Sequence, residues 1–363
     1  MKRKWSLRLG AAVLCAVLLG SCGSTAAAPA ESTAPADPLT GQQLLYPEQR
    51  AAAVVIENTT GSTTQWGIGS ASVVLEAAAR ADTAPSLCLV YPSVSAMPTV
   101  GPVTLGQDLF WRLLSGQQVL PIQRGCDLYT RNFLDYWNLR AVDALETGRN
   151  AFTTGNTDWA SPLWCTNGQS VAKVLGSLSL SSALSEDPAE SADSTQEGDT
   201  PAVPTVPALL PQQTDGHLPD ADVADAVQAA VQFPSSSTTR FAYDTDTGTY
   251  GMLHNDGSPQ LDANTGIQAA FDNLLVLYSA STPRDDGRTL DYDLTMGGGL
   301  WLNGGHLWHI TWTQGTGSTF AFYDADGRPL RILSGRSYIA WLSSLTGEEV
   351  TVQDSAGNDL LQP

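Results

Sequence analysis

The apolar positions in the first half of the chain predict strands that alternate with helices. Continuous apolar runs of strand length lie at 51–57, 87–91 and 119–122. Helical spacing or a helix-start pattern is found at 70–80, 108–115, 130–137 and 170–178. Thr104 to Gln107 has the form of a capping box, and Thr130 that of a helix cap. The alternation predicts a mixed α/β domain over 39–182.

The apolar pattern of the last third predicts a mostly antiparallel β domain over 223–363. Short strands flank turns rich in Asp and Gly at 241–250 and again at 320–327. Between them, residues 299–312 form two strand-like runs around Asn303-Gly304, and Asn-Gly is the strongest short-range hairpin pattern. Together the two halves predict an α+β fold, with an N-terminal mixed α/β domain followed by a mostly antiparallel β domain.

Two segments lack the apolar residues that a folded core requires. Residues 23–38 are rich in Ala, Ser, Thr and Pro, and residues 186–215 are rich in Asp, Glu, Ser, Thr, Pro and Gln. Such compositions bury too little apolar surface to offset the entropy lost on ordering. We therefore expect a flexible tether over 22–38 and an acidic low-complexity linker over 183–222.

The first 21 residues have the layout of a bacterial secretory signal peptide. Four basic residues and no acidic one accompany an apolar run over 9–19, which is about half the length of a membrane-spanning helix. The sequence Leu19-Gly20-Ser21-Cys22 is similar to a lipobox, whose cysteine is lipidated and becomes the first residue of the mature chain. We predict a lipoprotein held by palmitate on Cys22 at the extracytoplasmic face of the cell membrane. An ordinary signal peptide with a chance cysteine is the alternative.

The chain is strongly acidic. Its formal charge is −19, and removal of the predicted signal takes away four basic residues and no acidic one, which leaves −23. Such a chain is repelled by nucleic acid and by anionic lipid headgroups, so we expect no nucleic acid among its partners. Besides Cys22, the mature chain keeps Cys88, Cys126 and Cys165 without a Cys-x-x-Cys motif. One disulfide with one thiol and three buried thiols both fit this pattern.

Several short motifs match one known family. In the first half they are the segments 38–41, 54–58, 73–76 and 100–103. In the second half they are Tyr243-Asp244, Asp262, Asp272-Asn273, Gly287-Arg288, 297–299, Asn303-Gly304, Trp312, Asp326-Gly327, 333–335 and Tyr338-Ile339. With these residues the chain resembles the YerB-like lipoproteins of Gram-positive bacteria, a two-domain family without an established activity. The resemblance covers most of the mature chain outside the linkers.

The chain departs from this family at three places. Members usually carry Arg-Ser-Ala-Arg where this chain has Thr104-Leu105-Gly106-Gln107, and Glu-Gly-Gly-Ile-Thr-Arg where it has residues 81–86. A Pro-His-Asn segment is replaced around 161–164. Arginine pairs are suited to carboxylate or phosphate groups. The resemblance therefore implies that any anionic-ligand site of the family at these positions is lost or altered here.

Glu57, Asn58 and Glu76 are the candidate pocket residues. They lie at the ends of predicted elements and within the segments that match the family. Two carboxylates that face one cleft can act as acid and base, which makes a cell-wall-active hydrolase one hypothesis. A Glu76 on the exposed side of its predicted helix is the alternative, and the sequence leaves both open.

Other patterns of catalytic or metal-binding residues are incomplete. Ser170-Val-Ala-Lys173 matches the Ser-x-x-Lys of penicillin-recognising enzymes, but the accompanying Lys-Thr-Gly and Ser-x-Asn motifs are missing, which favours a solvated helix face. Of the mature histidines His217, His254, His306 and His309, the last two have an odd spacing that sends them to opposite faces of a strand.

The segments 244–248 and 324–327 resemble the start of calcium loops. They lack the remaining oxygen ligands, so tight turns are the better interpretation. We accordingly expect no bound metal and no cofactor.

The tryptophans offer a further binding surface. Aromatic faces suit the apolar faces of sugars, although core packing is the expected use of most of them. Those considered are Trp111, Trp137, Trp159, Trp164, Trp301, Trp308 and Trp312. Because no catalytic set is complete, we predict a membrane-tethered, non-catalytic binding or scaffold protein whose partner is an envelope protein or a cell-wall ligand. The cell-wall-active hydrolase is the alternative.

Overall fold

The computed structural model describes residues 36–58, 64–154, 163–184, 206–216, 218–233, 237–315, 319–345 and 347–361. The predicted signal peptide, Cys22, most of the predicted tether and residues 185–205 of the predicted linker lie outside these residues. Within them, no helix has the length and apolar character needed to cross a membrane.

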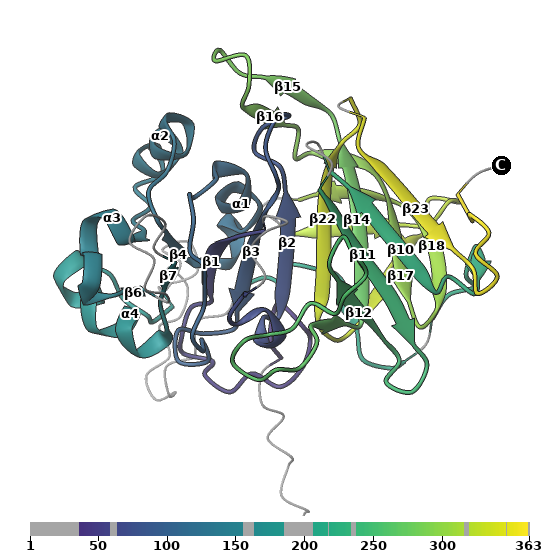
Figure 1. Cartoon of the computed structure of the whole chain (residues 1–363), viewed down its shortest axis with the longest axis horizontal. Coiled ribbons are helices and arrows are strands. Elements are labelled where there is room, and N and C mark those ends of the chain that lie inside the picture. The colour runs from purple at the N-terminus through teal and green to yellow at the C-terminus, as the bar shows by residue number, and fades with distance from the viewer. Residues whose placement is uncertain are drawn as a thin grey trace, which may run out of the picture. The chain divides into compact units, whose positions relative to one another are not determined.

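One large sheet forms the centre of the described structure (Figure 1). Its strand order is β20-β19-β18-β17-β14-β22-β2-β3-β1-β4-β5, and β9 pairs with β18. The bounds of these strands are β1 (Ala52–Glu57), β2 (Val73–Ala77), β3 (Ser86–Tyr91), β4 (Leu120–Gln123), β5 (Val142–Asp143), β9 (Val223–Ala224), β14 (Asn273–Ser279), β17 (Met296–Asn303), β18 (His306–Gln314), β19 (Phe320–Tyr323), β20 (Pro329–Leu330) and β22 (Ser337–Ser343).

Shorter sheets surround this one. An antiparallel sheet has the order β13-β12-β11-β10-β23, with β10 (Gln228–Gln232), β11 (Thr238–Asp244), β12 (Thr249–Leu253), β13 (Ala270–Phe271) and β23 (Glu349–Gln353). Three two-stranded pairs complete the β structure: β6 (Thr153–Thr154) with β7 (Trp164–Cys165), β8 (Gln212–Gln213) with β21 (Ile332–Leu333), and β15 (Ser281–Pro283) with β16 (Leu290–Tyr292).

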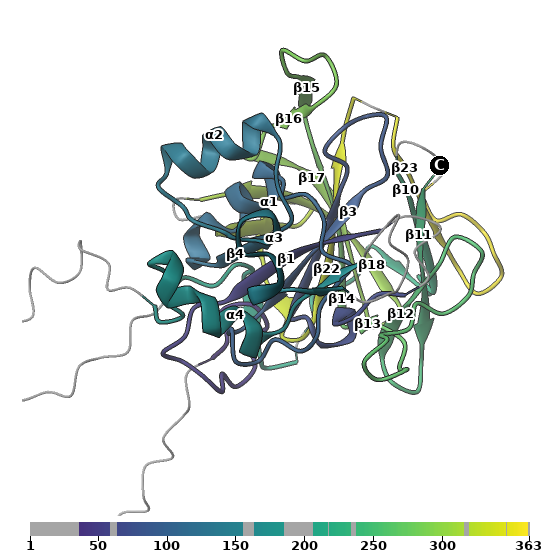
Figure 2. The ribbon, with the colours of Figure 1, turned by 60° about the vertical axis from the view of Figure 1, so that its left-hand side comes forward.

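The described helices are short and belong to the first half of the chain. They are α1 (Asp108–Leu113), α2 (Leu128–Tyr136), α3 (Ala144–Thr147) and α4 (Gly168–Leu175), with 3-10 turns at η1 (Ile68–Ser70), η2 (Ser115–Gln117), η3 (Gly148–Asn150) and η4 (Gly176–Leu178). Figure 2 shows these helices grouped at one end of the large sheet, away from the sheet of β10 to β13.

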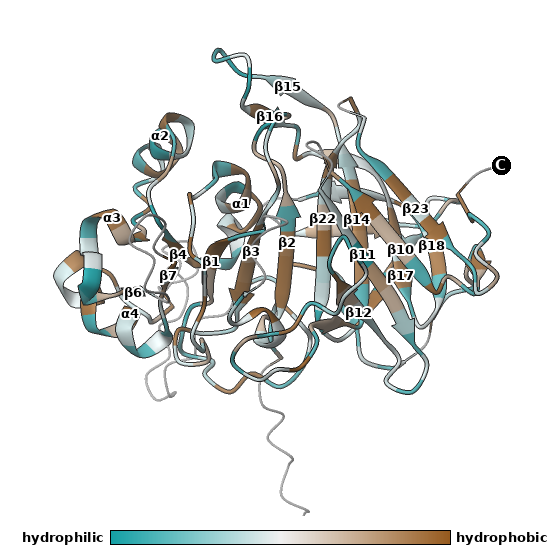
Figure 3. Cartoon of the chain, in the orientation of Figure 1, coloured by the Kyte–Doolittle hydropathy of each residue, from teal (hydrophilic) through white to brown (hydrophobic). Residues whose placement is uncertain are grey.

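The central strands of the large sheet, among them β1, β2, β3 and β22, are buried on both faces. Along β1, Val54 and Ile56 belong to one apolar cluster, whereas Val55 belongs to the other, as the alternation of strand side chains requires. One cluster includes residues of α4 and of the five-stranded sheet, and the other includes residues of α1. Figure 3 shows the resulting apolar character of β2, β3 and β22. Because both faces of these strands are covered, their sequences are continuous apolar runs without alternating polar residues.

The two halves of the chain share this sheet. Strand β2 of the first half pairs in parallel with β22 of the second half, from Val73 opposite Ser337 to Ala77 opposite Trp341. Helices in the first half and a strand-rich second half confirm the predicted α+β class.

The helix predicted over 70–80 is wrong, because this segment begins at the last residue of η1 and contains the central strand β2. Every residue from Val73 to Ala77 is buried. A strand with both faces covered has no exposed positions, so its sequence lacks the alternation that separates strands from helices. The spacing of valines and alanines was therefore misleading.

Two predicted helix caps also differ from the structure. Gln107 is the N-cap of α1 without a side-chain cap bond, and the Asp108 amide donates instead to Thr130 Oγ1 at 2.9 Å. Asp127 caps α2 by accepting from the amide of Thr130 at 2.7 Å, so Thr130 lies inside that helix. The contact between Asp108 and Thr130 is tertiary, whereas Asp127 caps α2 locally, three residues before Thr130, and aspartate is among the preferred N-cap residues.

The predicted hairpin around residue 303 is confirmed, with its turn displaced by one residue. Asn303 still pairs with His306, so Gly304 and Gly305 form the two-residue turn, at φ values of 58° and 79°. Both turn positions need a positive φ, which glycine adopts without a steric penalty.

Arg336 joins the two halves beside the central strands. Its guanidinium donates to the carbonyl oxygens of Ile68, Ala71 and Ala270 at 2.7–2.9 Å. It also lies 4.9 Å from the ring centre of Phe271. Burial is the largest influence on this group and lowers the pKa of Arg336. The residue thus ties η1 of the first half to β13 of the second.

Candidate functional site

The structure brings together two of the three predicted pocket residues. Asn58 donates from Nδ2 to Glu76 Oε1 at 2.6 Å. Glu57 is half-buried at the end of β1. Because strand side chains alternate, Glu57 lies on the opposite face of the sheet from its neighbour Ile56. Ile56 belongs to the apolar cluster on the face where Glu76 lies. Glu57 and Glu76 therefore do not face one cleft.

Glu76 is completely buried in the middle of the sheet, with 0% exposure. Besides Asn58, its carboxyl group accepts from Thr239 Oγ1 at 2.9 Å and from the Tyr338 hydroxyl at 2.5 Å. Burial raises the pKa of Glu76 to about 7, although the three donors act in the opposite direction. A carboxyl group held in this way links β2, β11 and β22 and has no solvent-accessible surface for a substrate.

The Ser170–Lys173 match lies on α4, whose N-cap Asn167 accepts from the amide of Ser170 at 2.8 Å. Lys173 is exposed in the last turn of this helix. The predicted solvated helix face is confirmed by this placement.

The aspartate-rich segments are turns, as predicted. Asp244 Oδ1 accepts from the amide of Asp246, and Asp324 Oδ1 accepts from those of Asp326 and Arg328, all at 2.8–2.9 Å. These oxygens stabilise the turns. Among the residues that the structure describes, no group of three His, Cys, Asp or Glu side chains is placed to hold a metal ion.

Cys88, Cys126 and Cys165 are free thiols in the described structure. Cys88 and Cys165 are buried, and burial raises the pKa of the Cys165 thiol to about 11. Both of these thiols are therefore protonated at neutral pH and behave as small apolar core residues.

A surface groove lies between the helices and the β15–β16 hairpin, and it was not predicted from the sequence. Its larger part has a volume of about 870 Å³, within the range of small-molecule sites, roughly 300–1,000 Å³. We call it the α2–β16 groove. It is lined by Arg112, Ser115, Phe133, Trp137, Ala280, Ser281, Thr282, Asp291, Tyr292, Asp293, Leu294, Thr295, Gln314 and Gly315.

The groove continues into a second hollow of about 480 Å³. The two share Arg112, Phe133, Thr282 and Asp291, and the second adds residues that include Tyr129. Because they share these four lining residues, the two hollows adjoin each other beside α2.

Ion pairs form the floor of the groove. Arg112 donates to Asp291 at 2.8 Å and to the carbonyl oxygen of Tyr292 at 3.1 Å. Arg284 pairs with Asp108 at 2.6 Å and with Asp291 at 3.1 Å. Burial lowers the pKa of Arg284, but the two carboxylates outweigh it, so the net shift is upward. Both arginines are thus engaged by carboxylates of the protein.

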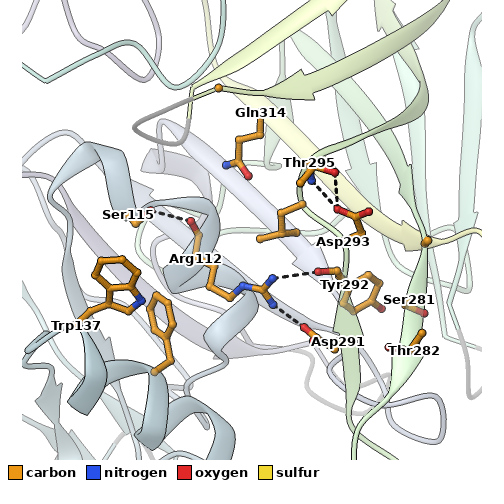
Figure 4. Close-up of a pocket in the computed structure, with 14 residues that line it drawn as sticks. Arg112, Ser115, Trp137, Ser281, Thr282, Asp291, Tyr292, Asp293, Thr295 and Gln314 are labelled. Atoms are coloured by element: carbon orange, nitrogen blue, oxygen red, sulfur yellow. Dashed lines mark hydrogen bonds and ion pairs between the residues drawn. The ribbon is translucent and has the colours of Figure 1, made fainter.

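Trp137 forms one wall. Figure 4 shows Trp137 on one side of the groove. Arg112 extends across the floor toward Asp291 and Tyr292, and Asp293 lies farther along the groove. The Trp137 side chain is 61% exposed, an unusual state for a large aromatic group. It follows α2 as its C-cap and lies edge-on to Tyr136, with ring centres 5.3 Å apart.

The other tryptophans named from the sequence have different surroundings. Trp111, Trp301, Trp308 and Trp312 are buried, so their predicted use in core packing is confirmed. Trp164 is half-buried, and Trp159 lies outside the described residues. Nothing in the local pattern separates Trp137 from these residues, because its exposure depends on where α2 ends against the hairpin.

Comparison with known proteins places this architecture in a family. Residues 39–180 match the N-terminal domain of a protein family of unknown function, DUF3048, and residues 229–339 match its C-terminal domain. The chain belongs to this two-domain family. The resemblance found in the sequence is thereby confirmed, and the boundary between the two family domains is crossed by the β2–β22 pairing.

A curated relative of this family is "Putative lipoprotein YerB" of Bacillus subtilis strain 168. It is 25% identical over 358 residues, which cover 96% of this chain and 98% of the relative. The crystal structure of YerB from Bacillus subtilis has a TM-score of 0.71 with 19% identity, and the match covers 87% of this chain and 99% of that chain. At that identity the solved structure supports the fold alone.

Several residues that match the family maintain the fold of its second domain. Asn273 Oδ1 accepts from the Trp301 indole at 3.0 Å and from the Asn303 amide at 3.1 Å. Gly335 has a φ of 145°, and an added Cβ would lie 2.5 Å from Asp272 Cγ. Only glycine suits that position. These matched residues therefore explain the shared architecture and do not line the α2–β16 groove.

Proposed function

We propose that this protein is a lipid-anchored envelope protein that binds a component of the cell envelope in the α2–β16 groove without altering it chemically. The observation that carries this proposal is an open groove in which the exposed Trp137 lies near partly exposed carboxylates. Exposed aromatic side chains in a concave, mixed polar surface are typical of binding sites.

The geometry of Glu76 favours binding over hydrolysis. A general acid or base must reach the reacting group, and Glu76 is buried with its oxygens bonded to three protein donors. Its arrangement supports a structural role between the two halves of the chain.

Lipid anchoring rests on the lipobox-like sequence before Cys22 and on the name of the Bacillus subtilis relative. Replacing Cys22 with alanine should abolish incorporation of labelled palmitate and move the protein from the membrane pellet to the soluble fraction. Each buried CH₂ of an acyl chain contributes about 0.8 kcal/mol to membrane binding, so loss of the chains removes the anchor.

Cys15→Ala is the matched control, because it changes a cysteine within the predicted signal peptide. It should leave labelling intact. Palmitate incorporation that persists in Cys22→Ala would contradict the anchoring proposal.

Binding through the groove can be tested by sedimentation of the purified Cys22→Ala protein, which lacks the proposed lipid anchor, with isolated cell envelopes. We expect Trp137→Ala to weaken this association by up to about tenfold, because removal of one stacked aromatic contact costs roughly 0.5–1.5 kcal/mol and about 1.4 kcal/mol corresponds to tenfold. Lys173→Gln, on the exposed face of α4, is a control that should bind as the unmodified chain does. Equal sedimentation of the Trp137→Ala variant and the unmodified chain would refute the role of the groove.

A further inference from the structure

We propose that the ligand of the α2–β16 groove is a saccharide chain without negative charge. This inference rests on the proposed binding function and adds the chemical class of the ligand. It follows from the charge of the groove, from the hydrogen-bond acceptors that line it and from the exposed aromatic wall.

The charge of the groove excludes anionic ligands. Its two hollows are lined by Asp108, Asp285, Asp291 and Asp293 but only by the cations Arg112 and Arg284. Both arginines already pair with Asp108 or Asp291. The remaining field is negative, and the formal charge of the whole chain is −19. A neutral or amine-bearing ligand avoids this repulsion.

The groove offers acceptors that match hydroxyl groups. Asp293 uses Oδ1 to accept from the amide and hydroxyl of Thr295 at 2.9 and 2.6 Å. Asp291 also uses Oδ1 for both of its arginine contacts. In the described structure, Oδ2 of each carboxylate accepts no protein hydrogen bond. Two free carboxylate oxygens can accept from the hydroxyl groups of a sugar.

The aromatic wall supplies the complementary apolar contact. Trp137 is supported by Tyr136 and by Phe133, whose ring centre lies 6.4 Å away. An exposed indole supported in this way presents a rigid apolar surface and an N–H donor at its edge. Sugar rings have the same combination of an apolar C–H face and polar edges.

The shape of the groove favours a chain over a single sugar. Two adjoining hollows of about 870 and 480 Å³ share four lining residues. A short oligosaccharide would extend along α2 and contact the polar groups of the hairpin. A peptide is the competing ligand, but its side chains would require deeper apolar pockets than this ion-paired floor provides.

The test is calorimetric titration of the purified mature protein with four probes of comparable length. Two are expected to bind: a tetramer of N-acetylglucosamine and its deacetylated, amine-bearing form. Two are expected to fail: a tetramer of galacturonic acid and a neutral pentapeptide. We expect Trp137→Ala to weaken binding of the first two about tenfold, since one aromatic stack is lost. Asp293→Asn, which keeps an oxygen for Thr295, should weaken it several-fold.

The controls separate stacking from folding. Trp137→Phe keeps an aromatic face and should retain binding within about threefold. Lys173→Gln, on the exposed face of α4 and outside the groove, should bind as the unmodified protein does. Unchanged thermal unfolding of each variant would establish that it is folded.

Three results would overturn the saccharide proposal: failure of both expected probes to bind, binding that does not depend on Trp137, or tighter binding of the uronic acid or the peptide. If envelope association depends on Trp137 but no saccharide binds, the proposed binding function is supported and only the saccharide proposal is refuted. Envelope association that does not depend on Trp137 would remove the binding function itself.

Discussion

Replacing Arg336 with methionine should lower the free energy of unfolding by about 3–5 kcal/mol, measured by denaturant titration. Methionine keeps much of the length of the side chain but donates no hydrogen bond. The carbonyl oxygens of Ile68, Ala71 and Ala270 would then lose a charged donor at 2.7–2.9 Å. These hydrogen bonds connect segments of the two family domains, so we expect both domains to unfold together.

Arg331→Met provides the matched control. Arg331 is exposed and donates to the carbonyl oxygen of Gln212 at 3.3 Å, so its loss should change stability by less than about 0.5 kcal/mol. If the free energy of unfolding of Arg336→Met lies within 1 kcal/mol of that of the unmodified protein, the Arg336 hydrogen bonds together contribute no more than about one ordinary hydrogen bond.

The stability of the protein should fall as the pH rises from about 4.5 to about 7 because of Glu76. Burial raises the pKa of Glu76 from 4.5 to about 7 in the folded chain. Between these values the folded state holds a proton that the unfolded state has released, so deprotonation favours unfolding as the pH increases. A shift of this size corresponds to about 3 kcal/mol between acid and neutral pH.

Glu76→Gln isolates this contribution because the amide resembles the protonated acid and does not ionise. The variant should match the unmodified protein near pH 4.5 and exceed it by about 3 kcal/mol above pH 7, with other carboxyl groups contributing equally to both. Thr239→Val removes one donor to the Glu76 carboxyl and should move the transition to higher pH. A stability difference that is constant over this range would refute the assignment.

The features predicted correctly from the sequence depend mainly on local patterns. The hairpin between β17 and β18 follows from turn residues beside alternating strands, and α4 follows from apolar spacing. The helix predicted over 70–80 failed for a nonlocal reason, since β2 is covered on both faces. Its neighbours β3 and β22 lie far from each other along the chain.

The candidate residues show the same division. Asn58 and Glu76 are hydrogen-bonded, but no local feature indicated that Glu76 lies inside a strand and is fully buried. The groove is lined by Trp137, which follows α2, and by Asp291 of β16. Arg112 donates a hydrogen bond to Asp291, from which it is separated by 179 positions in the sequence. Only the packing of the hairpin against the helices creates this surface.

By itself the sequence determined the fold class, the family resemblance, the acidic character and the turns, because propensity, composition and short-range hydrogen bonds act between near neighbours. Only the tertiary structure showed that residues 73–77 form strand β2, that Glu76 is buried, that Arg336 bonds to both halves of the chain, and that Trp137 forms an exposed wall of the groove. These features depend on which distant segments exclude water from a given side chain, and burial of that kind is a property of the assembled chain.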